Sequence, residues 1–279
     1  MIATPLTPSP GRPYAEVIGD PIAHSKSPLI HGFWLSTLGI AAEYRACHVR
    51  PEELSAYLTA RSADPDWRGC NVTIPHKLAV MDHVGDPGDI RGTIGAMNTV
   101  LRGSSGQLTG TNTDAGGFYA PIADLDLTDR PVAVIGGGGA ACAVLFALSR
   151  VGCGPVTILN RNVLKASALL ARFGLTGQAL PLTARLPAAA LLVNASALGM
   201  TGQPPLILDL SPLPEDALVY DCVYAPLETP LLAAASARGL VTVDGLDMLV
   251  GQAALAFELF FGAAPPEGRD DELRGLLLA

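Results

Sequence analysis

The chain alternates short apolar runs with longer stretches of helical character, and most of the apolar runs end in Gly, Asn or Asp. This alternation is typical of parallel β/α units, in which helices cover both faces of a sheet and the buried strands are apolar throughout. The predicted strands span residues 15–18, 43–48, 69–72, 132–135, 156–159, 191–193, 218–220 and 240–243. Residues 98–102 and 107–110, joined by Gly103-Ser104-Ser105-Gly106, predict a hairpin.

The pattern also predicts two α/β domains. A polar loop at 128–131 precedes the most glycine-rich segment of the chain, where a new β/α series begins. We expect a Rossmann-type parallel sheet after this loop and an α/β domain with a mostly parallel sheet before it. The helix that follows Gly245 is expected to pack back toward the first domain.

Composition and charge narrow the class of protein. Of 279 residues, 49% are hydrophobic and 16% are charged, which excludes a disordered chain. The net charge is -8, and no run of Lys or Arg could neutralise successive phosphates, so we expect no nucleic-acid partner. No apolar stretch is long enough to span a membrane, and residues 1–13 carry no secretion signal, so a cytoplasmic protein is expected. The apolar composition could include a subunit interface, so a homodimer is possible.

Metal and hydrolase chemistry find no support. The five cysteines are scattered without a CxxC pair, which predicts neither a disulfide framework nor a zinc site. The five histidines show no ligand spacing such as HExxH, and Ser196 lies in no GxSxG turn. No metal is therefore predicted.

A glycine turn after strand 132–135 indicates a dinucleotide site. Gly136, Gly138 and Ala141 fit GxGxxA, and a helical stretch follows, beginning around Gly139 and Ala140. The first glycine permits a tight turn, the second lets the backbone approach a pyrophosphate, and the small third residue lets helix and strand pack closely. Helix N–H groups then meet the anion. The alternative is a glycine turn that serves only strand-to-helix packing.

The next strand indicates NADP. An acidic residue at its end would bind the ribose 2′-hydroxyl of NAD, but this strand is followed by Asn160 and Arg161, with Lys165 one turn beyond. A guanidinium at this position suits a 2′-phosphate. The alternative is that Arg161 is an ordinary surface arginine.

Polar clusters mark the ends of the strands in the first domain, where ligands bind in α/β sheets. They are Ser25-Lys26-Ser27, 71–77, Asn98-Thr99 and Asn112-Thr113-Asp114. Such clusters suggest a substrate with several hydroxyls, and a ketone reduced by hydride would need a proton donor, for which Lys77 near Asp114 is the candidate. Pro75 is expected to begin a helix with Lys77 in its first turn. The alternative is that Lys77 and Asp114 are surface residues.

From about residue 14 to 261 the sequence resembles the shikimate dehydrogenases, NADP-linked enzymes that reduce 3-dehydroshikimate to shikimate in chorismate and aromatic amino-acid biosynthesis. The motifs that carry the resemblance are the glycine turn with Asn160-Arg161, Gly19-Asp20-Pro21-Ile22-Ala23-His24-Ser25-Lys26-Ser27-Pro28, Asn71-Val72-Thr73-Ile74-Pro75-His76-Lys77, Gly95-Ala96-Met97-Asn98-Thr99, Asn112-Thr113-Asp114 and Asp244-Gly245-Leu246-Asp247-Met248-Leu249-Val250-Gly251-Gln252. The resemblance implies a catalytic substrate domain over residues 1–127 completed by C-terminal helices at 246–279, and an NADP-binding Rossmann domain over 128–245.

The resemblance also implies roles for individual residues. Lys77 and Asp114 match the catalytic pair, and Ser25 and Ser27, with Tyr224, match the substrate carboxylate site. The residues implied to surround the ring hydroxyls are Asn71, Thr73, Asn98, Asp114 and Gln252. The residues implied to bind the cofactor are Gly136, Gly138, Gly139, Ala140, Asn160, Arg161, Lys165, Met200 and Gly245, with 194–200 along the nicotinamide.

Two departures from the family bear on the cofactor. Asn162 stands where the family usually has threonine, and Lys165 replaces a common arginine, exchanging a bidentate fork for a point charge. A weaker preference for NADP is therefore expected. Two alternatives stay open: an NAD-dependent quinate/shikimate dehydrogenase, and a non-catalytic metabolite sensor on the same fold.

Overall fold

A computed structural model describes residues 11–279, so most of the N-terminal segment considered for a secretion signal lies outside the described residues. The chain divides into two compact units: unit 1, up to Thr113 together with Ala253–Ala279, and unit 2, Asp114–Gln252. The domain limits at 127/128 and 245/246 stay a prediction about where the cofactor-binding fold begins and ends. Within residues 11–279, no helix combines the length and apolar character needed to cross a bilayer.

Unit 1 is built on a five-stranded sheet with the order β2-β1-β3-β4-β5. The strands are β1 (Tyr14–Gly19), β2 (Glu43–His48), β3 (Trp67–Val72), β4 (Thr99–Arg102) and β5 (Leu108–Thr111). β1 pairs in parallel with β2 and β3, whereas β4 is antiparallel to β3 and β5, so β4 alone runs against the others. The predicted hairpin and mostly parallel sheet are confirmed.

Both faces of this sheet are covered by apolar side chains. Tyr14 and Ile18 of β1 and Val72 of β3 belong to a buried cluster on one face. On the other face, β1 carries the smaller side chains of Ala15 and Val17, which lie beside Tyr44 and Asn71 respectively. The helical segments of unit 1 are α1 (Ser27–Thr37), η1 (Pro51–Glu53), α2 (Leu54–Ser62), η2 (Ala79–Asp82), α3 (Ile90–Thr93), the second part of α8 (Gly245–Phe261) and α9 (Asp270–Leu278).

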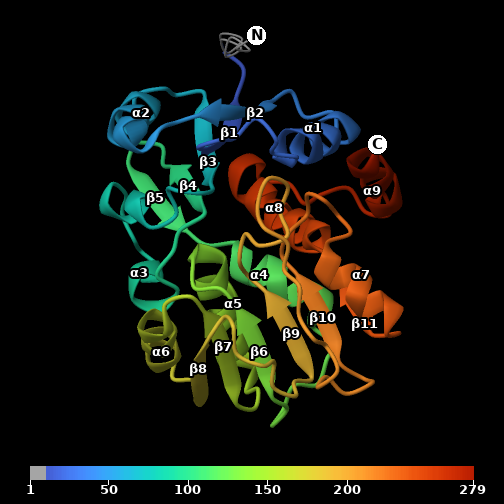
Figure 1. The fold of residues 1–279 in the computed structure, drawn as a ribbon. Helices are drawn as coiled ribbons and strands as arrows, with labels where there is room; N and C mark the ends of the chain where they lie inside the picture. The colour runs from blue at the N-terminus through green and yellow to red at the C-terminus, as the bar shows by residue number, and fades with distance from the viewer. Residues whose placement is uncertain (1–10) are drawn as a thin grey trace. The chain divides into compact units, whose positions relative to one another are not determined.

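Unit 2 contains a six-stranded sheet, with the order β11-β10-β9-β6-β7-β8 and every pairing parallel (Figure 1). The strands are β6 (Val132–Ile135), β7 (Val156–Asn160), β8 (Gly177–Pro181), β9 (Leu191–Asn194), β10 (Leu218–Asp221) and β11 (Val241–Val243). This is the Rossmann order, which reverses between β6 and β9 and so creates the switch point where such sheets bind ligands. The predicted Rossmann-type sheet is confirmed.

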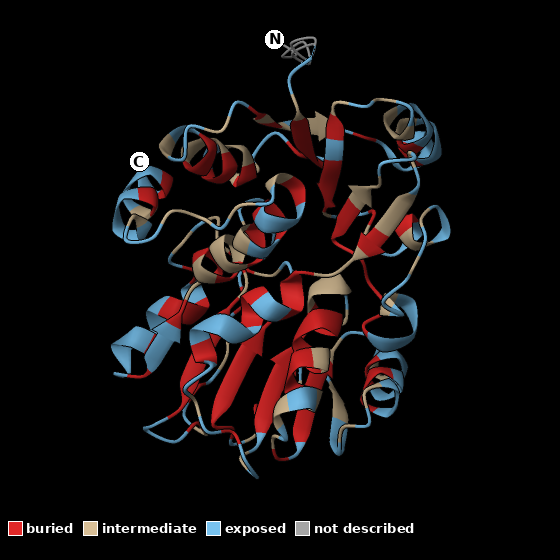
Figure 2. Ribbon diagram, turned by 180° about the vertical axis from the view of Figure 1, so that it is seen from behind, coloured by how far each residue is buried: buried red, intermediate tan, exposed pale blue. Residues whose placement is uncertain are grey.

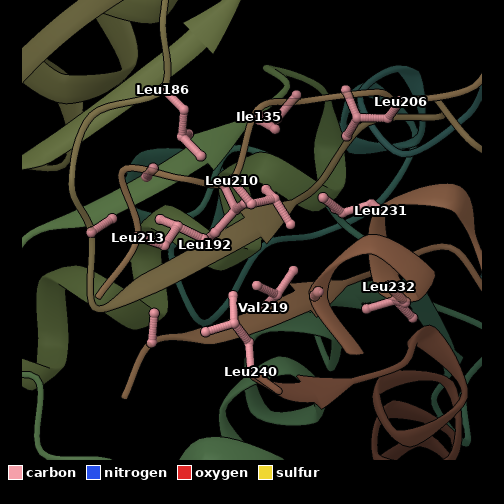
Figure 3. Close-up of a cluster of buried hydrophobic side chains, with 14 of the residues drawn as sticks. Ile135, Leu186, Leu192, Leu206, Leu210, Leu213, Val219, Leu231, Leu232 and Leu240 are labelled. Atoms are coloured by element: carbon pink, nitrogen blue, oxygen red, sulfur yellow. The ribbon is translucent and has the colours of Figure 1, made fainter. Parts of the chain in front are cut away.

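Helices cover the sheet of unit 2. They are α4 (Asp114–Tyr119), η3 (Ala120–Ile122), α5 (Gly139–Val151), α6 (Val163–Arg172), α7 (Pro230–Ala237) and the first part of α8. The residues of β6, β9 and β10 are buried, which fits the apolar runs that begin all three strands (Figure 2). One core cluster joins Leu192 and Val219 of the sheet to Leu231 of α7 and to Leu210 and Leu213 of a preceding loop (Figure 3).

Candidate active site

Two serines lie at the start of α1, an eleven-residue helix in unit 1. Ser27 is its first residue and is buried, and its backbone N–H donates to the Ser25 hydroxyl at 3.3 Å. The helix has no capping side chain, and Pro28 occupies the first turn. Two hydroxyls at a helix N-terminus suit a carboxylate, because the helix dipole and unsatisfied N–H groups favour negative charge there.

A buried network of polar side chains lies at the end of β3 and the start of β4. The Asn71 amide donates to the Thr99 hydroxyl at 3.1 Å, and the Thr99 hydroxyl donates to the Asn98 side-chain oxygen at 3.0 Å. The Asn98 oxygen also accepts from the Thr113 backbone N–H at 2.8 Å. Tyr44 completes the network by donating to the Asn71 Oδ1 at 2.6 Å. The structure thus brings the predicted residues Asn71 and Asn98 together, and Tyr44 is a member that the sequence analysis missed.

Thr73 and Lys77 lie in the turn that follows β3. The Thr73 backbone N–H donates to the Ile18 carbonyl at 2.9 Å, and a Cβ on Gly19 would lie 2.6 Å from the Thr73 methyl, so Gly19 leaves the room that Thr73 occupies. The prediction that Pro75 begins a helix carrying Lys77 is wrong. Residues 74–78 form turns before η2, and the Lys77 carbonyl accepts from the distant Met97 N–H at 2.9 Å, which ties this turn to the segment before β4. The helix dipole expected to act on Lys77 is therefore lacking.

Asp114 and Gln252 belong to unit 2. Asp114 is buried and is the first residue of α4, directly after the anchored Thr113. A Cβ on Gly117 of α4 would lie 2.6 Å from the Gln252 backbone nitrogen, so a glycine is needed where α4 crosses α8. The Gln252 side chain is buried and donates to the Leu249 carbonyl at 2.9 Å.

The glycine turn follows β6 as predicted. Gly136 has a φ of +121°, and a Cβ there would lie 2.7 Å from the Ala195 carbonyl oxygen at the end of β9. A Cβ on Gly138 would meet no atom of the described residues within 4 Å. Gly138 is the N-cap of α5 and brings no capping side chain, and Gly139 and Ala140 open the helix. Open space and uncapped N–H groups fit the pyrophosphate of a dinucleotide.

The end of β7 carries the residues expected to select the cofactor. Asn160 is the last residue of β7, and Arg161 and Lys165 are exposed just beyond it. Asn162 is the N-cap of α6, and its side-chain oxygen accepts from the Lys165 N–H at 3.0 Å. Asn162, which departs from the family's usual threonine, thus stabilises the helix start. No acidic residue stands between Asn160 and Lys165, so the segment fits a 2′-phosphate better than a free ribose hydroxyl.

A buried carboxylate, Asp221, ties together the loops after β9 and β10. Its oxygens accept from the Asn194 side chain at 2.8 Å, the Val223 N–H at 3.0 Å and the Thr229 hydroxyl at 2.7 Å. Burial raises the pKa of Asp221, and these hydrogen bonds oppose the rise. The sequence analysis missed Asp221, although an acidic residue at the end of an apolar strand is a signal that could have found it.

The same loops carry the remaining predicted residues. Tyr224 is half-buried, and burial raises the pKa of its hydroxyl. Met200 lies in a turn after β9, next to Thr201, whose N–H donates to the Ala225 carbonyl at 2.7 Å. A Cβ on Gly245, the first residue of α8, would lie 2.5 Å from the backbone at 222–223. Among residues 11–279, no group of three or more His, Cys, Asp or Glu side chains could hold a metal ion.

Known proteins match both units. The family model of the shikimate dehydrogenase substrate binding domain matches residues 17–100, and the model of the shikimate 5′-dehydrogenase C-terminal domain matches residues 245–269. A shikimate dehydrogenase (NADP(+)) of Sphingopyxis alaskensis is 70% identical over 267 residues, which cover 96% of this chain and 97% of the relative. The chain belongs to the shikimate dehydrogenase family.

Solved structures of this family have the same fold. Shikimate 5-dehydrogenase from Thermus thermophilus, in complex with NADP(H) and shikimate, is 39% identical with a TM-score of 0.84, over 95% of this chain and 100% of that one. Quinate dehydrogenase from Corynebacterium glutamicum, in complex with NAD, is 30% identical with a TM-score of 0.83, over 95% of this chain and 99% of that one. Shikimate dehydrogenases and a quinate dehydrogenase therefore share the two-domain α/β fold found here.

Proposed function

We propose that this chain is an NADP-linked oxidoreductase that interconverts 3-dehydroshikimate and shikimate. The observation that carries the proposal is the coincidence of a glycine turn open at Gly138, an arginine where NAD enzymes have an acid, and a 70% identical relative that is a shikimate dehydrogenase (NADP(+)). The shikimate and NADP(H) in the related Thermus structure support both ligands.

Polar side chains bind the substrate in this proposal. Ser25 and Ser27 bind its carboxylate with the N–H groups of the α1 N-terminus, and Tyr224 adds a hydroxyl. The residues that bind the ring hydroxyls are Asn71, Thr73, Asn98, Asp114 and Gln252. A ring with fewer hydroxyls would leave buried polar groups unpaired, each at a cost of about 1 to 3 kcal/mol, so these residues select a polyhydroxylated ring.

Lys77 and Asp114 carry the proton. In the direction of reduction, the Lys77 ammonium donates a proton to the ketone oxygen as the carbon receives a hydride, and in oxidation the neutral amine takes that proton back. Asp114 orients the amine. NADPH supplies the hydride when bound, so one hydride and one proton together convert the ketone to the alcohol.

The cofactor is bound by unit 2. The α5 N-terminus, with Gly136, Gly138, Gly139 and Ala140, takes the pyrophosphate. Asn160, Arg161 and Lys165 bind the 2′-phosphate, whereas Met200 and Gly245 line the nicotinamide. Because Lys165 is a point charge and Asn162 is engaged as a cap, Arg161 provides the planar recognition of the phosphate.

The location and assembly of the protein extend the proposal. We assign the protein to the cytoplasm, a location consistent with the biosynthetic role of its relatives. We keep the homodimer as an expectation from the apolar composition. We also keep two expected absences: no nucleic-acid partner, from the charge of -8, and no membrane partner, from the lack of a long apolar stretch.

Rates with two substrates and two cofactors test the proposal. We expect kcat/KM to be highest for shikimate with NADP. Preference for quinate with NAD would favour an NAD-dependent quinate/shikimate dehydrogenase. This alternative is supported by the 30% identity to a quinate dehydrogenase in complex with NAD. No nicotinamide reduction with any combination would favour a non-catalytic sensor.

A further inference from the structure

The hydroxyl of Tyr44 reaches across a strand to Asn71, a proposed substrate-binding residue. Tyr44 lies on β2 and Asn71 on β3, and β1 runs between them. Tyr44 is paired with Ala15 and Asn71 with Val17, so the short Ala15 side chain leaves the tyrosine ring room to cross. The two side chains meet at 2.6 Å, and both are buried.

The tyrosine ring is held independently of its hydroxyl. It stacks on the His31 ring with 3.8 Å between centroids and 3° between planes, and it lies near the Phe260 ring. Neither ring nitrogen of His31 has a hydrogen-bond partner among the described residues, so His31 does not compete for the Tyr44 hydroxyl. Removing that hydroxyl should leave the ring in place.

One unambiguous donor fixes the direction of the hydrogen bonds that link Thr113 to Tyr44 through Asn98, Thr99 and Asn71. The Thr113 backbone N–H can only donate, so the group that it meets on Asn98 is the side-chain oxygen. That oxygen can only accept, so the Thr99 hydroxyl donates to it. With its proton used, Thr99 accepts from Asn71, and the group of Asn71 at Thr99 is therefore the amide nitrogen.

The direction at Tyr44 follows from this order. The Asn71 oxygen is turned toward Tyr44, which must donate to it. One amide hydrogen of Asn71 is used by Thr99, and the other makes only a long hydrogen bond of 3.5 Å to the Asn98 carbonyl, at the distance limit for such a bond. Asn71 is therefore set to offer a ligand an N–H donor.

The geometry points to Tyr44 as a positioning residue for substrate binding: its hydroxyl holds the Asn71 oxygen, so that Asn71 binds a substrate oxygen as a donor and cannot turn to act as an acceptor. This role rests on the proposed function. Tyr44 would then contribute to substrate selection through Asn71, although the Tyr44 side chain itself is buried.

Tyr44→Phe tests the role. Losing one positioning hydrogen bond should raise the KM for shikimate about 3- to 10-fold, with kcat within about twofold, because the bond serves ground state and transition state alike. The KM for NADP should not change. Tyr57→Phe is the matched control, because it removes a 2.7 Å hydroxyl bond to Glu16 elsewhere in unit 1 and should leave the KM for shikimate unchanged.

A double variant separates positioning from general structural support. In an Asn71→Ala background, Tyr44→Phe should have no further effect on the KM for shikimate. An equal increase in both backgrounds would overturn the proposal, as would a wild-type KM in Tyr44→Phe alone. If the wild-type protein oxidises no shikimate, the proposed function itself fails.

Thr99 provides a second route if Tyr44→Phe does not fold. Thr99→Val removes the acceptor at the other end of the Asn71 amide and should raise the KM for shikimate to a similar extent. Thr99→Ser retains the hydroxyl and should restore the wild-type KM. Equal KM values for the two Thr99 variants would contradict the ordered network.

Discussion

The buried imidazole of His31 makes the stability of unit 1 depend on pH. Its side chain is 0% exposed, its ring nitrogens have no partner among the described residues, and burial lowers its pKa from 6.5 to about 3. The folded protein therefore holds His31 neutral, whereas the unfolded chain binds a proton below pH 6.5. The stability from this difference is fully present above pH 6.5 and is lost as the pH falls toward 3.

The size of the effect follows from the two pKa values. Each pH unit between them costs about 1.4 kcal/mol, so lowering the pH from 7 to 5 should reduce the free energy of unfolding by about 2 kcal/mol through His31 alone. Other groups also titrate in this range, so the effect must be read as a difference between proteins. His31→Phe keeps an aromatic ring in the cluster and removes the titration.

Urea unfolding followed by tryptophan fluorescence measures this difference. Both tryptophans of the chain, Trp34 and Trp67, are buried in unit 1, so their emission reports on the unit that contains His31. Between pH 7 and pH 5 the wild type should lose about 2 kcal/mol more than His31→Phe. His83→Gln, at an exposed histidine, controls for loss of an imidazole. Equal losses for wild type and His31→Phe would refute the reasoning.

Three further predictions concern activity. Lys77→Ala should lower kcat for shikimate by about 100-fold or more with a smaller change in KM, as steady-state kinetics will show, and an unchanged kcat would remove Lys77 from the mechanism. Gly19→Ala places a methyl against Thr73 and should raise the KM for shikimate about 5-fold or more. The control Gly32→Ala, with no described atom within 4 Å of the new Cβ, should leave this KM unchanged. Similar KM values for the two variants would contradict a steric effect on Thr73. Arg161→Ala should raise the KM for NADP about 10-fold and leave the KM for NAD unchanged, and parallel increases for both would argue against a 2′-phosphate contact.

The sequence predicted most strands of the two sheets, because strands such as β6, β9 and β10 are buried on both faces and contain short apolar runs. β8 was missed for the opposite reason. It is the edge strand of its sheet, none of its five residues is buried, and it ends in Pro181. An edge strand without a buried face has neither an apolar run nor a clean alternation in its sequence.

Contacts between distant segments account for the other differences. Residues 74–78 form turns where a helix was expected, and their contact with the distant Met97 N–H through the Lys77 carbonyl cannot be predicted from local sequence. Tyr44 could be placed in a strand, but its contact with Asn71 depends on β1 lying between β2 and β3, an order that local sequence does not contain. The glycine turn was predictable because its chemistry is local: strand, glycines and helix follow one another directly.

Transfer of a labelled hydride tests the central claim most directly. The protein is incubated with 3-dehydroshikimate and NADPH deuterated at both C4 positions, and the product is analysed by mass spectrometry and NMR. The account predicts shikimate carrying one deuterium on the carbon that was the ketone. Shikimate without deuterium at that carbon, or no shikimate at all, would contradict it.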